Sequence, residues 1–162
     1  MTTDTSALGA ALAELERRDL VGRDTVSAFE GDHQFSFNHV LVRDVAYELL
    51  PRARRQERHR EVALFLEDSS GEFGEIGAAL ARHWRDAGDQ ERAVDYFAEA
   101  AAAAERGWAK QRAADLYREA YTLVPEDDAR RTELRRRLAL AEQASLHVLD
   151  ARLMGLGGPA AG

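Results

Sequence analysis

The chain has 162 residues, of which 45% are hydrophobic and 31% charged, and this balance excludes wholesale disorder and predicts one domain or two small ones. It contains no cysteine, which excludes disulfides, iron–sulfur clusters, thiolate zinc sites and cysteine nucleophiles. The formal net charge of −7 argues against a general electrostatic attraction to nucleic acid or to anionic lipid.

The N-terminal part of the chain combines a helix with a β-hairpin. Leucines recur at helical spacing over residues 8–20 and predict a first helix that is terminated by Gly22. Two short strands are then predicted at 26–29 and 34–37, joined by a turn around Gly31. In the second strand phenylalanine alternates with polar residues, which is typical of a strand with one buried face.

The apolar period becomes helical from His39 onward. Pro51 divides this stretch into two helices, 39–50 and 51–68, because proline disfavours helix in the residue before it and suits a first helical turn. Helix, hairpin and helix together outline the latter part of a winged-helix domain. We therefore expect a winged-helix-like domain over residues 1–68, followed by a short linker.

The remaining sequence predicts four more helices. Small and aromatic residues recur in two of them: Ala93-x3-Phe97-x2-Ala100 and Ala113-x3-Tyr117-x2-Ala120. Small residues let helices approach closely and the aromatic ring fills the space beside them, which is the packing of tetratricopeptide (TPR) repeats. We expect TPR-like antiparallel helical hairpins over 72–154 and a flexible tail over 155–162. The fold class is then mainly α.

Motifs of known enzymes and cofactor sites are absent from the sequence. There is no P-loop, no Gly-x-Gly-x-x-Gly after a strand, no His-Glu-x2-His and no Gly-x-Ser-x-Gly. The five histidines have no metal-ligand spacing. We expect a chain that is not an enzyme by itself and that holds no cofactor and no metal.

Five arginines lie on the helix predicted after Pro51, within the run PRARRQERHR. Arginine offers a forked, permanently charged donor set, so the helix could contact phosphates. The alternative is a solvated helix face on which Glu57 and Glu61 pair with arginines three or four residues away. The candidate contact residues are Arg52, Arg54, Arg55 and Arg58.

His39 lies where the aromatic strand passes directly into a helix. An imidazole at a helix N-terminus sits beside exposed backbone N–H groups, a place suited to anion binding. The alternative is a capping or partly buried histidine.

The region from about Leu12 to Asp89, and more loosely on to Pro125, resembles part of the bacterial STAND-class signalling ATPases. These include LuxR-type regulators and ATPase modules associated with adenylate or guanylate cyclases. The specific stretch is FSFNHVLVRDVAYELLPRARRQERHREVALFLE, with support from LERRDL before it and AGDQERAVDYFAEAA after it. In that class an ATPase core precedes a winged helix and a helical-repeat arm, so the resemblance covers the second and third pieces.

The resemblance also implies a role for His39. It matches a winged-helix histidine that contacts the ADP phosphate in the related NB-ARC switch proteins. Asn38 and Val40 depart from the methionine and aspartate that flank that histidine. A phosphate-sensing role for His39 would therefore require an ATPase core outside this chain.

Two functions follow as expectations. The first is a non-catalytic signalling module that binds a protein partner, namely an ATPase core, an effector domain or a peptide. The aromatic candidates for its contact surface are Trp84, Tyr96, Trp108 and Tyr117. The second is a DNA-binding winged-helix transcription regulator whose helical arm senses a signal or dimerises, with the arginines forming a positive stripe.

We expect a cytoplasmic protein with no membrane partner. The first ten residues lack the basic-then-apolar layout of a signal peptide, and no apolar run approaches about 20 residues.

Overall fold

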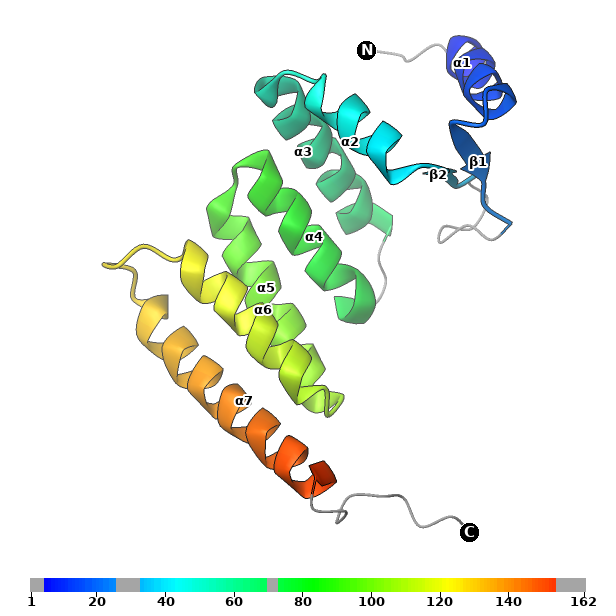
Figure 1. Ribbon diagram of the computed structural model, residues 1–162. Helices are drawn as coiled ribbons and strands as arrows, with labels where there is room; N and C mark the ends of the chain where they lie inside the picture. The colour runs from blue at the N-terminus through cyan, green and yellow to red at the C-terminus, as the bar shows by residue number, and fades with distance from the viewer. Residues whose placement is uncertain (1–4, 26–32, 70–72, 154–162) are drawn as a thin grey trace. The chain divides into compact units, whose positions relative to one another are not determined.

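The computed structural model describes residues 5–25, 33–69 and 73–153 (Figure 1). These residues form seven helices and a two-stranded antiparallel sheet, which confirms the mainly α fold with a small β-hairpin. The chain divides into two compact units, 1–55 and 56–162. None of the described helices is both long and apolar enough to cross a membrane.

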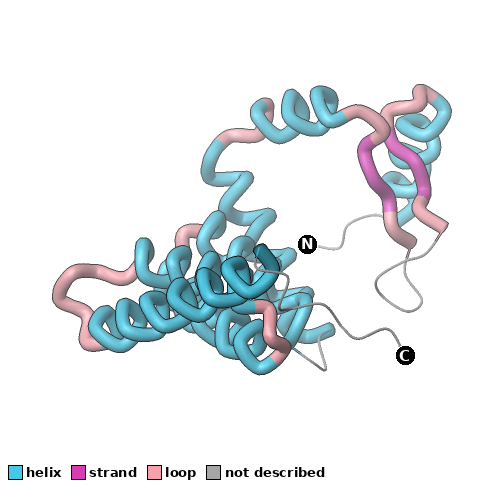
Figure 2. The backbone as a smooth tube through the Cα atoms, turned by 60° about the horizontal axis from the view of Figure 1, so that its bottom comes forward, coloured by secondary structure: helices cyan, strands magenta, loops and turns pink. Residues whose placement is uncertain are grey.

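The first unit contains α1 (Thr5–Arg17), β1 (Val21–Arg23), β2 (Phe35–Phe37) and α2 (Val40–Glu48). The strands pair in the register Val21 with Phe37, Gly22 with Ser36 and Arg23 with Phe35. Figure 2 shows this hairpin in magenta. Among the described side chains of the unit, Val21 alone is buried.

The hairpin differs from its prediction in the first strand. The partner of β2 is residues 21–23, whereas the predicted strand 26–29 and the predicted turn around Gly31 lie outside the described residues. Gly22 does not terminate α1 but lies within β1. A Cβ at Gly22 would meet Asn38 Oδ1 at 2.9 Å, so any larger residue there would have to displace the Asn38 side chain.

Asp19 makes the turn that Gly22 was expected to make. Its φ is 59°, in the left-handed region that aspartate tolerates better than most residues. Asn38 holds this turn by donating from Nδ2 to the Asp19 carboxylate at 2.7 Å and to the Asp19 carbonyl at 3.2 Å. A side chain just after β2 thus stabilises the end of α1.

α3 (Arg52–Ser69) begins directly after Pro51, and with α2 it matches the predicted pair of helices. The division between the two units falls inside α3, between Arg55 and Gln56, whereas the sequence suggested a boundary at 68–72. The reason is that the later turns of α3 belong to the core of the second unit. Ala63 and Leu66 are buried there, and Glu67 bonds to side chains of the next two helices.

The second unit continues with α4 (Phe73–Ala87), α5 (Gln90–Arg106), α6 (Lys110–Leu123) and α7 (Arg130–Leu153). Successive helices run antiparallel and lie side by side (Figure 1), as the predicted helical hairpins require. All six residues of the repeated small-aromatic-small pattern are buried: Ala93, Phe97, Ala100, Ala113, Tyr117 and Ala120. The repeat therefore forms the contact between helices.

A glycine turn joins α4 to α5. Gly88 has φ 87°, and the Asp89 side chain then caps α5 by accepting a hydrogen bond from the Arg92 backbone N–H at 3.2 Å. α4 therefore ends at Ala87 and α5 begins at Gln90.

Candidate functional site

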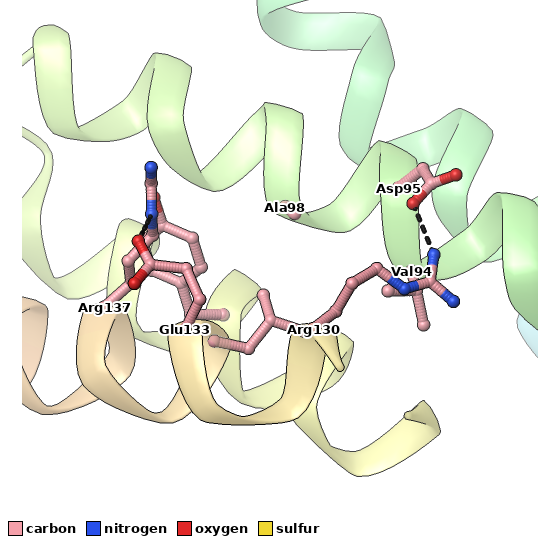
Figure 3. A pocket seen from close by; sticks show the side chains of 8 residues that line it. Val94, Asp95, Ala98, Arg130, Glu133 and Arg137 are labelled. Carbon is pink, nitrogen blue, oxygen red and sulfur yellow. Dashed lines mark hydrogen bonds and ion pairs between the residues drawn. The ribbon is translucent and has the colours of Figure 1, made fainter. Parts of the chain in front are cut away.

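A hollow of about 200 Å³ opens on the second unit between α5 and α7, with α6 beneath it. We call it the α5–α7 groove (Figure 3). Its lining residues are spaced so that each helix presents one face: Val94, Asp95 and Ala98 on α5; Tyr117 on α6; Arg130, Glu133, Leu134 and Arg137 on α7.

The floor of the groove is apolar. Val94 and Leu134 are buried, Ala98 is half-buried, and the ring of Tyr117 lies underneath. The Tyr117 hydroxyl donates to Glu105 Oε2 at 2.8 Å and accepts from Arg137 at 3.3 Å. Burial raises the pKa of Tyr117, so its hydroxyl stays protonated and the floor stays uncharged.

The rim of the groove is charged and internally paired. Arg130 lies between two carboxylates, with a nitrogen 2.7 Å from Asp95 Oδ1 and another 2.7 Å from Asp128 Oδ2. Arg137 contacts Glu133 at 2.8 Å. Hydrogen bonds from Arg136 and Arg137 lower the pKa of Glu133 to about 2, so this carboxylate is ionised throughout the physiological range.

Two further hollows adjoin the groove and share residues with it. One, of about 500 Å³, is lined by Glu67, Arg92, Asp95 and Tyr96. The other, of about 340 Å³, is lined by Gln90, Glu91, Val94, Leu123, Pro125, Asp128 and Arg130. Asp95, Val94 and Arg130 each line two of these hollows. The α5–α7 groove and the two adjoining hollows are therefore continuous, and we call them together the concave surface.

Glu67 organises one end of this surface. Its Oε1 accepts hydrogen bonds from Trp84 Nε1 at 3.0 Å and from the Tyr96 hydroxyl at 2.7 Å. The Arg92 guanidinium stacks over the Trp84 ring, with its central carbon 4.4 Å from the ring centroid. Burial, with the hydrogen bond to Glu67, raises the pKa of Tyr96 to about 12. Tyr96 is therefore a fixed donor at neutral pH.

The four aromatic candidates from the sequence have different positions. Trp84 is 2% exposed and Tyr117 0%, so both belong to the core, and of the two only Tyr117 lines the α5–α7 groove. Tyr96 lines the hollow of about 500 Å³. Trp108 is 84% exposed in the turn between α5 and α6, has φ 59°, and lines none of the three hollows.

The arginine candidates make local contacts. Arg55 stacks over the Tyr47 ring at 5.0 Å, and Arg58 pairs with Glu61 at 2.6 Å, three residues away. Arg52 and Arg54 are exposed. The pairing of Arg58 with Glu61 is the contact that a solvated helix face predicts.

His39 occupies the N-cap position of α2, as its place in the sequence suggested. Its carbonyl accepts from the backbone N–H groups of Val42 at 3.1 Å and Arg43 at 3.2 Å, but its imidazole makes no capping hydrogen bond. The side chain is exposed. Its role toward a nucleotide stays a prediction.

The structure also pairs two histidines that the sequence analysis did not connect. His59 of α3 and His83 of α4 have their Nδ1 atoms 3.0 Å apart. Burial and the nearby His59 lower the pKa of His83. Within the described part of the chain, no three histidine or carboxylate side chains lie close enough together to hold one metal ion.

The charged rim was missed by the sequence analysis. Asp95 and Arg130 are 35 residues apart, and only the folded helices bring them together. The available signal was the helical spacing of charged residues beside the small-aromatic-small pattern.

Comparison of the chain with protein-family models, with curated proteins and with solved structures finds no match in any of the three.

Proposed function

We propose that the chain is a non-catalytic signalling module that binds a segment of a protein partner on the concave surface of its second unit. The observation that carries the proposal is the α5–α7 groove, in which an apolar floor is bordered by charged side chains of α5 and α7. Concave surfaces of stacked helical hairpins commonly hold a peptide or a helix.

The resemblance to STAND-class ATPases supports a regulatory role and suggests the partner. An ATPase core, an effector domain or a peptide would dock on the helical arm. The DNA-binding alternative would use Arg52, Arg54, Arg55 and Arg58 on phosphates. Arg55 and Arg58 already contact Tyr47 and Glu61, and the net charge of −7 opposes that alternative.

The test is a selection of 12-residue peptides from a displayed random library on the full chain. Binders are then titrated against Ala98→Trp, which fills the groove, and against Ala139→Trp, the same change at an exposed position of α7 that does not line it. We expect Ala98→Trp to weaken binding at least tenfold, because an apolar anchor in a pocket typically carries more than 1.4 kcal/mol.

Ala139→Trp should bind like the parent chain. Peptides that bind both variants equally would place the binding site elsewhere, and a selection that yields no specific peptide would contradict the proposal.

A further inference from the structure

The concave surface carries more acidic than basic side chains. Among its described lining residues, five are carboxylates (Glu67, Glu91, Asp95, Asp128 and Glu133) and three are guanidinium groups (Arg92, Arg130 and Arg137), a net charge of −2. At a surface of this kind an opposite charge on the partner speeds encounter and fixes its register.

The three arginines are held by contacts within the protein. Arg130 bridges Asp95 and Asp128, and Arg137 bridges Glu133 and the Tyr117 hydroxyl. Arg92 lies over the Trp84 ring, with nitrogens 3.5 Å from Glu67 and 3.6 Å from Asp89. An acidic partner would have to compete with these carboxylates for each guanidinium.

The carboxylates keep capacity for a second cation. A carboxylate has about four lone-pair sites, and Arg130 engages one oxygen of Asp95, whose side chain is 63% exposed. In Figure 3 the other oxygen of Asp95 points away from Arg130. Glu91 is exposed and makes no hydrogen bond or ion pair with the described part of the chain. Both face the hollows from α5.

The α5–α7 groove, which Asp95 borders, accepts one large apolar side chain. A dry cavity of roughly 150 Å³ holds a benzene molecule. The volume of about 200 Å³ between Val94, Ala98 and Leu134 is therefore enough for a leucine or phenylalanine side chain.

We infer that the occupant is a basic segment of a partner protein, in which one large apolar side chain enters the α5–α7 groove and flanking lysines or arginines lie over Asp95 and Glu91. This inference rests on the proposed function and specifies the chemistry of the partner.

The experiment uses a peptide selected as above, synthesised in three versions that keep the apolar anchor and carry lysine, glutamine or glutamate at the flanking positions. Fluorescence anisotropy gives the Kd of each version for the full chain. We expect the lysine version to bind tightest and the glutamate version weakest. Each exposed charge pair should contribute about two- to fivefold, and raising the salt concentration should reduce the difference.

Asp95→Asn removes the negative charge of Asp95 and keeps a side chain of the same size, so it tests the contribution of that charge alone. It should weaken the lysine version about two- to fivefold and leave the glutamine version unchanged. Glu99→Gln is the matched control, because Glu99 is an exposed carboxylate one turn further along α5 that lines none of the three hollows. It should leave both versions unchanged.

The outcomes separate the inference from the proposed function. Tighter groove-dependent binding of the glutamate version would overturn the basic partner and leave the peptide-binding function intact. Binding that Ala98→Trp does not weaken would overturn both. Sedimentation of the chain as a dimer that Ala98→Trp converts to a monomer would identify a second copy as the occupant and overturn the inference.

Discussion

Glu67 joins α3 to the two helices that follow it. Its Oε1 receives the Trp84 indole N–H and the Tyr96 hydroxyl, and the first of these donors is almost fully buried. A buried donor that loses its acceptor costs about 1–3 kcal/mol, which exceeds the value of most surface ion pairs. Glu67 therefore contributes to stability chiefly as an acceptor and only secondarily as a charge.

Glu67→Ala should lower the free energy of unfolding by about 1–3 kcal/mol, because it leaves Trp84 Nε1 and the Tyr96 hydroxyl without their acceptor. Glu67→Gln keeps a carbonyl oxygen at this place and should cost less. Urea unfolding of the two variants measures the difference. Equal losses would mean that the charge of Glu67, and not its acceptor role, is what stabilises the core.

His83 makes stability depend on pH. Its pKa is lowered first by burial and then by His59 of α3, with Arg82 acting in the same direction and Asp86 opposing it on α4 itself. In the unfolded chain His83 takes up a proton near its ordinary pKa, whereas in the native state it takes up a proton only at lower pH. Below the ordinary pKa the unfolded state therefore binds more protons than the native state. The free energy of unfolding is therefore unaffected by His83 above about pH 6.5 and decreases as the pH falls below this value.

His83→Gln should reduce the loss of stability between pH 7.5 and pH 5.5. The measurement is the urea midpoint of parent and variant at both values. His147→Gln is the control, since His147 is exposed and contacts the Gln143 carbonyl. An unchanged pH dependence in His83→Gln would show that other groups cause the loss.

The helices were largely predictable from the sequence and the hairpin only in part. The helical periods of α2 to α7 are long enough to reveal each helix, and Pro51, Gly88 and Pro125 mark where they break. β1 has three residues, too few to show an alternation, and its glycine resembles a helix terminator. Asp19 took the left-handed turn because Asn38, distant in sequence, holds it there.

The candidate site was less predictable than the fold. The small-aromatic-small repeat identified residues that pack, and Tyr117, which belongs to it, is therefore in the core. Trp84 lies outside the repeat and is buried as well. The groove depends on pairs such as Asp95 with Arg130, which form only when α5 and α7 are packed on α6. Helical spacing alone does not give the relative rotation of two helices.

Two glycines of the second unit should respond to substitution in opposite directions. Gly77 lies inside α4, where an added Cβ would meet Ala100 Cβ at an ordinary 3.5 Å. Gly77→Ala should therefore raise the free energy of unfolding by about 0.4–1 kcal/mol. Gly88 has φ 87°, so Gly88→Ala should lower it by about 1–2 kcal/mol. Thermal and urea unfolding measure both, and a loss in Gly77→Ala would indicate that α4 and α5 cannot accept the methyl group.

The two units differ in how many of their side chains are buried. Val21 is the single buried side chain among those described in the first unit, and α2 leaves Leu41 74% and Val45 58% exposed. The second unit buries aromatic, leucine and alanine side chains along α4 to α7. The free energy of local opening should follow this difference.

Hydrogen exchange measured by mass spectrometry should show amides of α1 and α2 exchanging much faster than those of α5 and α6. Peptides that span residues 5–17 and 40–48 are compared with peptides that span 90–106 and 110–123, each corrected for its intrinsic rate. Equal protection in the two sets would mean that the apolar face of α2 is covered in solution.

The two tryptophans give this protein a built-in optical reporter. Trp84 is buried, with the Arg92 guanidinium stacked on its ring, and Trp108 is largely exposed to solvent. Acrylamide should quench the emission in two distinct classes. Trp108→Phe should leave a blue-shifted, poorly quenched spectrum whose red shift on denaturation follows the opening of the α3–α5 junction alone.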